Sequence, residues 1–191
     1  MSMELLARFR VALGWVVAPL VLIAAVPTPV SLIAGAAIAA AGEAIRIWAA
    51  GHLNKAREVT ASGPYRWFAH PLYVGSSVIG AGLSVASASP IAAGLVILYL
   101  VVTLKAAVRS EEAFLRRTFG DQYDLYRSNR AAARASQAAI ARRFSLTQAM
   151  TVNREYRAVV GLAGALLLLA LKATYNGSFW ATVGALVRPG G

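Results

Sequence analysis

The sequence predicts an all-α fold: a polytopic membrane bundle of about five transmembrane helices with amphipathic helices on its cytoplasmic face. Hydrophobic residues make up 58% of the 191 residues and charged residues only 14%, whereas soluble domains carry about 25% charged residues. The apolar residues fall into runs near the roughly 20 residues that cross a ~30 Å hydrocarbon core. The basic residues collect on one side of these runs. Together, these observations predict a chain that crosses the membrane repeatedly.

The five expected spans follow one another closely in the sequence. The first has no A-x-A-like exit and leads directly into the second, so no cleavable signal is expected. The third and fourth are joined by "SASP", which ends at Pro90 and predicts a tight helical hairpin. The expected spans are Val11 to Val26, Val30 to about Ala50, Leu72 to Ser87, Ile91 to Val108 and Ala158 to Ala173.

The positions of the basic residues predict the orientation of the bundle. With a cytoplasmic N-terminus, all but two of the 19 Lys and Arg residues fall on the cytoplasmic side, the exceptions being Lys172 and Arg188. This is the positive-inside distribution of multi-pass membrane proteins, and Lys172 can extend its ammonium to the interface. Because topology explains the net charge of +11, no nucleic-acid partner is expected.

The segment from Arg109 to Arg157 is too polar to span the membrane and is expected on its cytoplasmic surface. Its first part spaces apolar residues at helical intervals up to a break at Gly120. The stretch "NRAAARASQAAIARR" contains no acidic residue, which favours contact with anionic headgroups. "SLTQ", Ser145 to Gln148, predicts a capping box ahead of the last span. The tail "NGSFWATVGALVRPGG" is expected to lie on the surface, anchored by Trp180.

Few residues are available to hold a metal. The chain has no cysteine, two histidines and eight acidic residues. The lack of cysteine excludes disulfides and thiolate metal sites, and zinc sites use three or four converging side chains. We therefore expect no metal site.

Two charged residues lie inside the second expected span. Glu43 and Arg46 are three residues apart, so they share a helix face. Charges at this depth are unfavourable unless they are paired. The sequence leaves two interpretations open: an ion pair that locks helices together, or one residue that faces a buried polar pocket.

The stretch "GPYRWFAHPLYVG", Gly63 to Gly75, places polar and aromatic residues at the start of the third span. Its Gly-Pro pair predicts a turn, and Pro71 predicts that the helix starts at His70, because a residue before proline disfavours αR geometry. His70 and Tyr73 then share one face of the first helical turn. Gly75 leaves room for a close approach to the backbone. By itself, this pattern is also typical of an interfacial aromatic belt.

A second polar stretch, "SEEAFLRRTFGDQYDLY", lies just past the fourth span. A hairpin of the third and fourth spans brings the start of one beside the end of the other, so Glu111 and Glu112 are expected near His70 and Tyr73. Two carboxylates beside a histidine suit a small cationic molecule with an amino-acid end. Alternatively, Glu112 pairs with Arg116 on its own helix, at i,i+4 spacing.

These two stretches resemble a known family, the integral membrane isoprenylcysteine carboxyl methyltransferases and their phospholipid N-methyltransferase relatives. The resemblance lies in "SGPYRWFAHPLYVG", followed after a helical hairpin by "SEEAFLRRTFGDQYDLY". It covers about Arg46 to Arg127. It implies an S-adenosylmethionine-dependent methyltransferase that acts on a lipophilic, membrane-embedded substrate at the cytoplasmic face.

The resemblance also implies roles for individual residues. The backbone from Arg57 to Thr60 would pass along the cofactor. From its location, and not from the resemblance, Glu112 is the nearest candidate base for an amine or hydroxyl substrate. The family's carboxylate-holding arginine falls on Ala107, so Lys105 or Arg109 would have to substitute for it. The implied cofactor contacts are Arg57, Val59, Tyr65, His70, Pro71, Leu72, Tyr73 and Glu111.

The chain departs from the family pattern at three positions. Ala69 replaces the arginine before the histidine, Ala107 replaces the arginine that holds a substrate carboxylate, and Arg57 replaces a histidine ahead of the Gly-x-Tyr turn. These departures argue against prenylated cysteine as the substrate. The expected partners are therefore membrane lipids and a lipophilic or lipidated substrate, with the methylated atom and the oligomeric state left open.

We expect one integral membrane domain over residues 1–191. Its parts are the first two spans (1–50), a cofactor-binding core with the helical hairpin (51–130), and a basic surface segment with the C-terminal span (131–191). Two other functions compete with methyl transfer. A membrane reductase of related architecture would bind NADPH through basic residues, for which Lys55, Arg57 and Arg66 are available. A non-enzymatic scaffold would bind anionic lipid through Arg109 to Arg157, in a salt-dependent manner.

Overall fold

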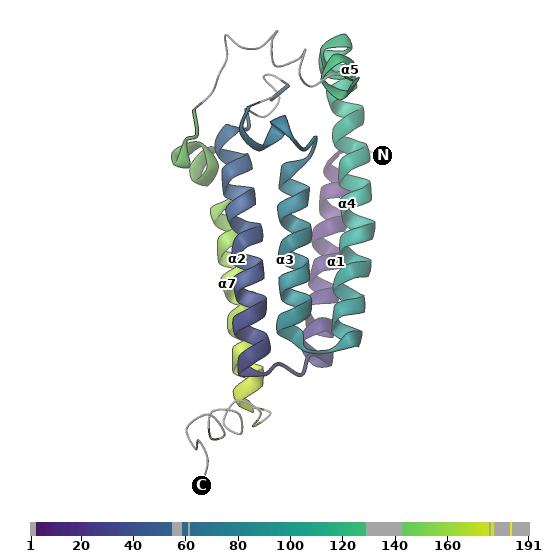
Figure 1. Ribbon diagram of the computed structural model, residues 1–191. Helices are drawn as coiled ribbons and strands as arrows, with labels where there is room; N and C mark the ends of the chain where they lie inside the picture. The colour runs from purple at the N-terminus through teal and green to yellow at the C-terminus, as the bar shows by residue number, and fades with distance from the viewer. Residues whose placement is uncertain are drawn as a thin grey trace.

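The computed structural model describes residues 3–54, 59–60, 62–128, 143–175, 177 and 184. Over these residues the chain is helical, with no strand among them, so the all-α prediction is confirmed (Figure 1). The basic stretch at residues 129–142 and the surface tail expected around Trp180 lie outside the described residues.

Five long helices form an antiparallel bundle (Figure 1). They are α1 (Met3–Ala24), α2 (Pro29–His52), α3 (Pro71–Ser87), α4 (Pro90–Phe119) and α7 (Tyr156–Tyr175). By length and composition α2, α4 and α7 can cross a membrane, whereas α3 and the Ala12–Ala24 part of α1 are shorter apolar helices. At 1.5 Å per residue, α3 is about 26 Å long, somewhat less than a ~30 Å hydrocarbon core. The architecture is that of an integral membrane protein. Of the five expected spans, α2, α4 and α7 are long and apolar enough to cross a membrane.

Prolines and hydroxyls determine where the helices begin. In α2, α3 and α4 a proline occupies the first turn, where its missing N–H is not needed. Thr28 and Ser31 form a capping box at α2, with Ser31 N donating to Thr28 Oγ1 (3.2 Å) and Thr28 N donating to Ser31 Oγ (2.9 Å). Ser89 Oγ accepts from Ala92 N (3.4 Å) at the start of α4. Ala88, with φ 47°, completes the predicted hairpin turn between α3 and α4.

Helices α2 and α3 approach each other closely because glycines line their contact. A Cβ placed on Gly42 would lie 2.7 Å from Gly75 O, and one placed on Gly35 would lie 2.5 Å from Gly82 O. Small residues of this kind allow the backbones of membrane helices to come together. The close approach predicted at Gly75 is therefore made by α2.

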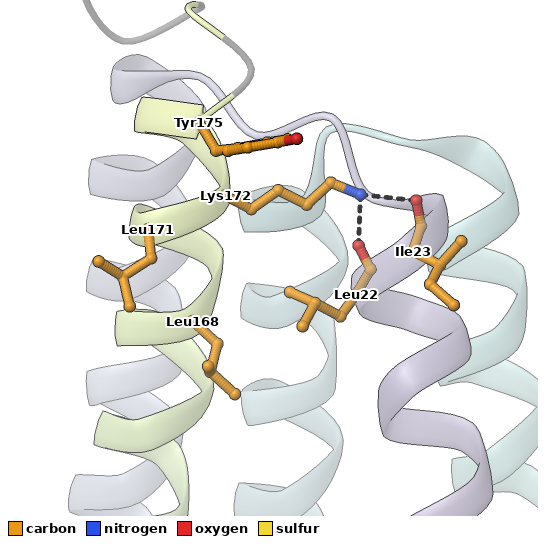
Figure 2. Close-up of a pocket in the computed structure, with 6 residues that line it drawn as sticks. All are labelled: Leu22, Ile23, Leu168, Leu171, Lys172 and Tyr175. Carbon is orange, nitrogen blue, oxygen red and sulfur yellow. Dashed lines mark hydrogen bonds between the residues drawn. The ribbon is translucent and has the colours of Figure 1, made fainter.

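At the end of the bundle remote from the start of α3, α7 caps α1. Lys172 Nζ donates hydrogen bonds to Leu22 O and Ile23 O, both at 2.6 Å (Figure 2). These carbonyls belong to the last turn of α1, where the helix supplies no further amide to satisfy them. A cation is also favourable at the negative end of the helix dipole. Tyr175 and leucines of α7 line a shallow apolar groove beside this contact (Figure 2).

The described chain resumes at Arg143 and reaches α7 through a short π-helical turn, η3 (Gln148–Val152). Gln148 N donates to Ser145 Oγ (3.2 Å), so one half of the predicted capping box is present. The prediction is wrong for the other half, because Ser145 N donates to Gly51 O (3.2 Å) and the Gln148 side chain donates through Nε2 to Leu53 O (3.0 Å). The turn also does not continue into α7, since Arg154, with φ 58°, interrupts it.

Candidate functional site

The candidate site lies at the end of the bundle where α3 begins and α4 ends (Figure 1). Helix α4 extends past its apolar run to Phe119, and Gly120, with φ 46°, then turns the chain into α5 (Asp121–Ser128). The helix break predicted at Gly120 is therefore confirmed. It directs α5 toward the loop that joins α2 to α3.

His70 lies between two carboxylates of α4. Its Nδ1 is 3.6 Å from Glu111 Oε2, and its Nε2 is 3.3 Å from Glu112 Oε1. His70 precedes α3 with φ −135° and ψ 66° and forms no side-chain cap on that helix, as expected for a residue that Pro71 excludes from αR geometry. The predicted juxtaposition of the two polar stretches is confirmed.

The two carboxylates favour the charged form of this imidazole. Burial lowers the pKa of His70, whereas hydrogen bonds to Glu111 and Glu112 and their negative charge raise it, and the net effect is a raised pKa. When protonated, the ring can donate from both nitrogens, one toward each carboxylate. The arrangement therefore holds a positive charge between two negative ones.

Two tyrosines surround His70 and Glu111. The ring centroid of Tyr73 is 5.7 Å from that of His70, so the two rings share a face as predicted. Tyr65 lies in a short 3-10 turn, η1 (Gly63–Arg66), and is 6% exposed. Burial and the negative charge of Glu111 raise the pKa of Tyr65, so its phenol keeps the proton and can act as a donor.

Helix α5 fastens the loop between α2 and α3. Tyr126 Oη donates to Tyr65 O (3.0 Å) and to Phe68 O (3.4 Å). Val59, one of the predicted cofactor residues, is 3% exposed and packs with Tyr123 and Tyr126. These contacts connect the loop to the end of α4 through α5.

Glu112 is held by residues of two other elements. Its Oε1 contacts both His70 Nε2 and Arg127 Nη1, the latter at 3.2 Å. The alternative i,i+4 pair with Arg116 is wrong, because Arg116 Nε lies 3.4 Å from Asp124 Oδ1 on α5. Glu112 is thereby positioned by α3 and α5 together.

Sequence reasoning assigned no role to Tyr123, Tyr126 or Arg127. The signal was present, because both tyrosines stand in the quoted motif "GDQYDLY". Their contacts depend on how α5 folds back after Gly120.

The remaining predicted residues differ in where they lie. Pro71 is buried and Leu72 half-buried in the first turn of α3. Arg109 is exposed, and within the described part of the chain no hydrogen bond or ion pair joins it to His70 or to the glutamates. Arg57 lies outside the described residues.

A second polar cluster lies deeper in the bundle, around Arg46 of α2. Its guanidinium contacts Glu155 through Nη2–Oε2 (2.8 Å) and Nε–Oε2 (3.1 Å), and Nη1 donates to Ser76 Oγ on α3. Glu43 Oε2 is farther away, at 3.8 Å from Arg46 Nε. The predicted ion pair within α2 is therefore secondary to a pair between α2 and the segment before α7.

Comparison with protein families places the site in a known context. Residues 30–122 match the model of the family described as Phospholipid methyltransferase. This stretch contains every residue predicted for the site, whereas Tyr123, Tyr126, Arg127 and everything from residue 143 onward lie beyond it. Comparisons with curated proteins and with solved structures gave no match. The predicted family resemblance is confirmed over residues 30–122, which are similar to phospholipid methyltransferases.

Proposed function

We propose that the protein is an S-adenosylmethionine-dependent methyltransferase that acts on a lipophilic substrate at the cytoplasmic face of a membrane. The family match supports a membrane methyltransferase in general. The observation that carries the proposal further is the placement of His70 between Glu111 and Glu112, at the end of the helical hairpin.

The residues present fit a cationic nucleotide-like cofactor. Of the two carboxylates, Glu111 is the more open, with a side chain 36% exposed against 20% for Glu112. It offers acceptor oxygens to an ammonium group or to ribose hydroxyls. The half-buried ring of Tyr73 supplies aromatic surface, which favours cations. When bound, S-adenosylmethionine supplies a methyl group activated by its sulfonium.

Glu112 is suited to accept a proton from an amine or hydroxyl substrate. Its closest contacts with His70 and Arg127 are both made through Oε1. His70 and Arg127 fix the direction of this carboxylate, as a general base requires. Arg109, exposed one turn earlier on α4, is the candidate to hold a substrate carboxylate.

The distribution of charge supports a cytoplasmic site. The connections around residues 25–28 and 88–89, at the other end of the bundle, contain no charged residue. Arg116 and Arg117 at the end of α4 and Arg127 on α5 lie at the end that carries the site. By the positive-inside rule, this end faces the cytoplasm, and membrane lipids are the immediate partners.

The proposal is tested by incubating the detergent-purified protein with a deuterated methyl donor and a lipid extract, and by measuring S-adenosylmethionine affinity. We expect a mass gain in a lipid-soluble product. Affinity should fall at least about 10-fold in His70→Ala and Glu111→Gln, as for a lost hydrogen bond to a charged group. Asp124→Asn removes an exposed carboxylate nearby and should bind as the wild type does.

Each result has a defined consequence. Unchanged affinity in both site variants would remove the site assignment. A wild-type protein that binds NADPH and not S-adenosylmethionine would replace methyl transfer with reduction. Salt-sensitive lipid binding without affinity for either cofactor would favour the scaffold.

A further inference from the structure

A segment outside the family region packs on the end of α2, beside the loop that carries Tyr65. We name residues 143–155 the clamp. Its polar groups donate to backbone carbonyls at the end of α2: Ser145 N to Gly51 O (3.2 Å), Asn153 Nδ2 to Ala50 O (2.8 Å) and to Leu53 O (3.0 Å). The last carbonyls of a helix have no amide partner within it. The clamp therefore caps α2 from another part of the chain.

The clamp also reaches the loop through a ring contact. The ring centroids of Phe144 and His52 are 5.9 Å apart, and His52 is 7% exposed. On the loop side, a Cβ placed on Gly63 would lie 2.6 Å from His52 Cγ. Gly63, with φ 55°, begins the turn that holds Tyr65. Contacts thus run from Phe144 through His52 and Gly63 to the candidate cofactor site.

A buried ion pair fixes the far end of the clamp. Glu155, 6% exposed, accepts two hydrogen bonds from Arg46 Nη2, at 2.8 and 3.1 Å. Arg46 also donates to Ser76 Oγ on α3. The clamp is therefore joined to both helices whose ends hold the loop.

We propose that the clamp sets the position of loop residues 62 to 70, and that Asn153 and Phe144 are positioning residues for the candidate site. The effect on cofactor affinity rests on the proposed function, whereas the ordering of the loop does not. If the loop adopts the cofactor-binding conformation in only a fraction of the molecules, the apparent dissociation constant for the cofactor rises in inverse proportion to that fraction. Loss of the clamp should therefore raise KM for the methyl donor and leave kcat almost unchanged.

The test uses the full chain and two clamp variants. Asn153→Asp replaces the amide donor with an oxygen facing two carbonyls, and Phe144→Ala removes the ring on His52. Thr151→Ala is the matched control, because the exposed Thr151 donates its hydroxyl to Thr147 O within the clamp. Hydrogen exchange of residues 62–70, measured without ligand, should be about 10-fold faster in the two variants and unchanged in the control.

The outcomes separate the two proposals. If residues 62–70 exchange at the same rate in Asn153→Asp and Thr151→Ala, the proposed role of the clamp is wrong. Faster exchange spread evenly over all helices would also contradict it, because it would indicate general destabilisation. If Asn153→Asp does not fold, Phe144→Ala carries the same comparison. A wild-type protein without affinity for S-adenosylmethionine would overturn the proposed function, while loop exchange would still decide on the clamp.

Discussion

His70 Nε2 lies 3.3 Å from Glu112 Oε1, although 42 positions separate the two residues in the sequence. The hairpin of α3 and α4 makes this possible, since His70 directly precedes one helix and Glu112 lies near the end of the other. Because the same oxygen contacts Arg127, the start of α3, the end of α4 and α5 meet at one carboxylate. The charge on His70 is therefore coupled to the geometry of all three elements.

The first prediction concerns the pH dependence of stability. Burial lowers the pKa of His70, but Glu111 and Glu112 raise it further, so the folded-state pKa lies above the unfolded value. The folded state then binds the proton of His70 more tightly than the unfolded chain does, so protonation raises the free energy of unfolding. This contribution is fully present below the unfolded pKa of about 6.5. It is lost as the pH rises through the folded-state pKa. Thermal melting in detergent, followed upward from about pH 6, should show this loss.

The control for this prediction is the same melting series on His70→Gln. The variant lacks the titrating ring, so its melting temperature should change less with pH over this range. Glu112→Gln should reduce the effect without abolishing it, because Glu111 remains. A His70→Gln curve parallel to that of the wild type would show that other groups cause the dependence.

A second prediction compares two tyrosines of α5. Tyr126→Phe removes the donor to Tyr65 O and Phe68 O, which leaves a buried carbonyl unsatisfied and should destabilise the protein by about 1–3 kcal/mol. Tyr123→Phe removes a buried hydroxyl that has no hydrogen-bond partner among the described residues, so it should be neutral or stabilising. Thermal shift in detergent measures both. Equal losses in the two variants would contradict the assigned role of Tyr126.

The helices and the meeting of the two polar stretches could be predicted because they follow from local signals. Apolar length gave the helices, Pro71 and Pro90 marked helix starts, and the short turn at Ala88 leaves the hairpin few alternatives. A hairpin places the start of α3 beside the end of α4 without information on side-chain packing. His70 and Glu111 could therefore be paired from the sequence.

The contacts that were not predicted form between segments far apart in the sequence, namely α2 and the segment before α7. Arg46 has an acidic neighbour three residues away, but its closest acidic partner, Glu155, is 109 positions distant. Likewise, the Gln148 side chain could accept from Ser145 N in a local capping box, but it donates instead to Leu53 O just after α2. Local spacing cannot choose between such partners, because the choice is made by the packing of α7 on α2.

A third prediction tests the close packing of α2 against α3. Gly42→Ala would place a methyl group 2.7 Å from Gly75 O, so the helices must separate. Overpacking of this kind destabilises by about 1–3 kcal/mol. Gly161→Ala is the control, because no described atom beyond its chain neighbours and the nearby backbone of α7 lies within 4 Å of a Cβ there. Replacing this glycine in α7 should stabilise by about 0.5–1 kcal/mol. Opposite shifts in melting temperature are expected, and a neutral Gly42→Ala would contradict the close contact.

The last prediction distinguishes the two acidic neighbours of Arg46. Arg46→Gln leaves Glu155, 6% exposed, without its cation and should destabilise by about 3–5 kcal/mol, the usual effect of breaking a buried pair. Glu43→Gln removes a carboxylate whose oxygens are buried without a hydrogen-bond partner among the described residues, and it leaves the Arg46–Glu155 pair intact. It should therefore be neutral or stabilising in the same melting assay. If Glu43→Gln is as damaging as Arg46→Gln, the ion pair within α2 stabilises the bundle, and the pair with Glu155 does not.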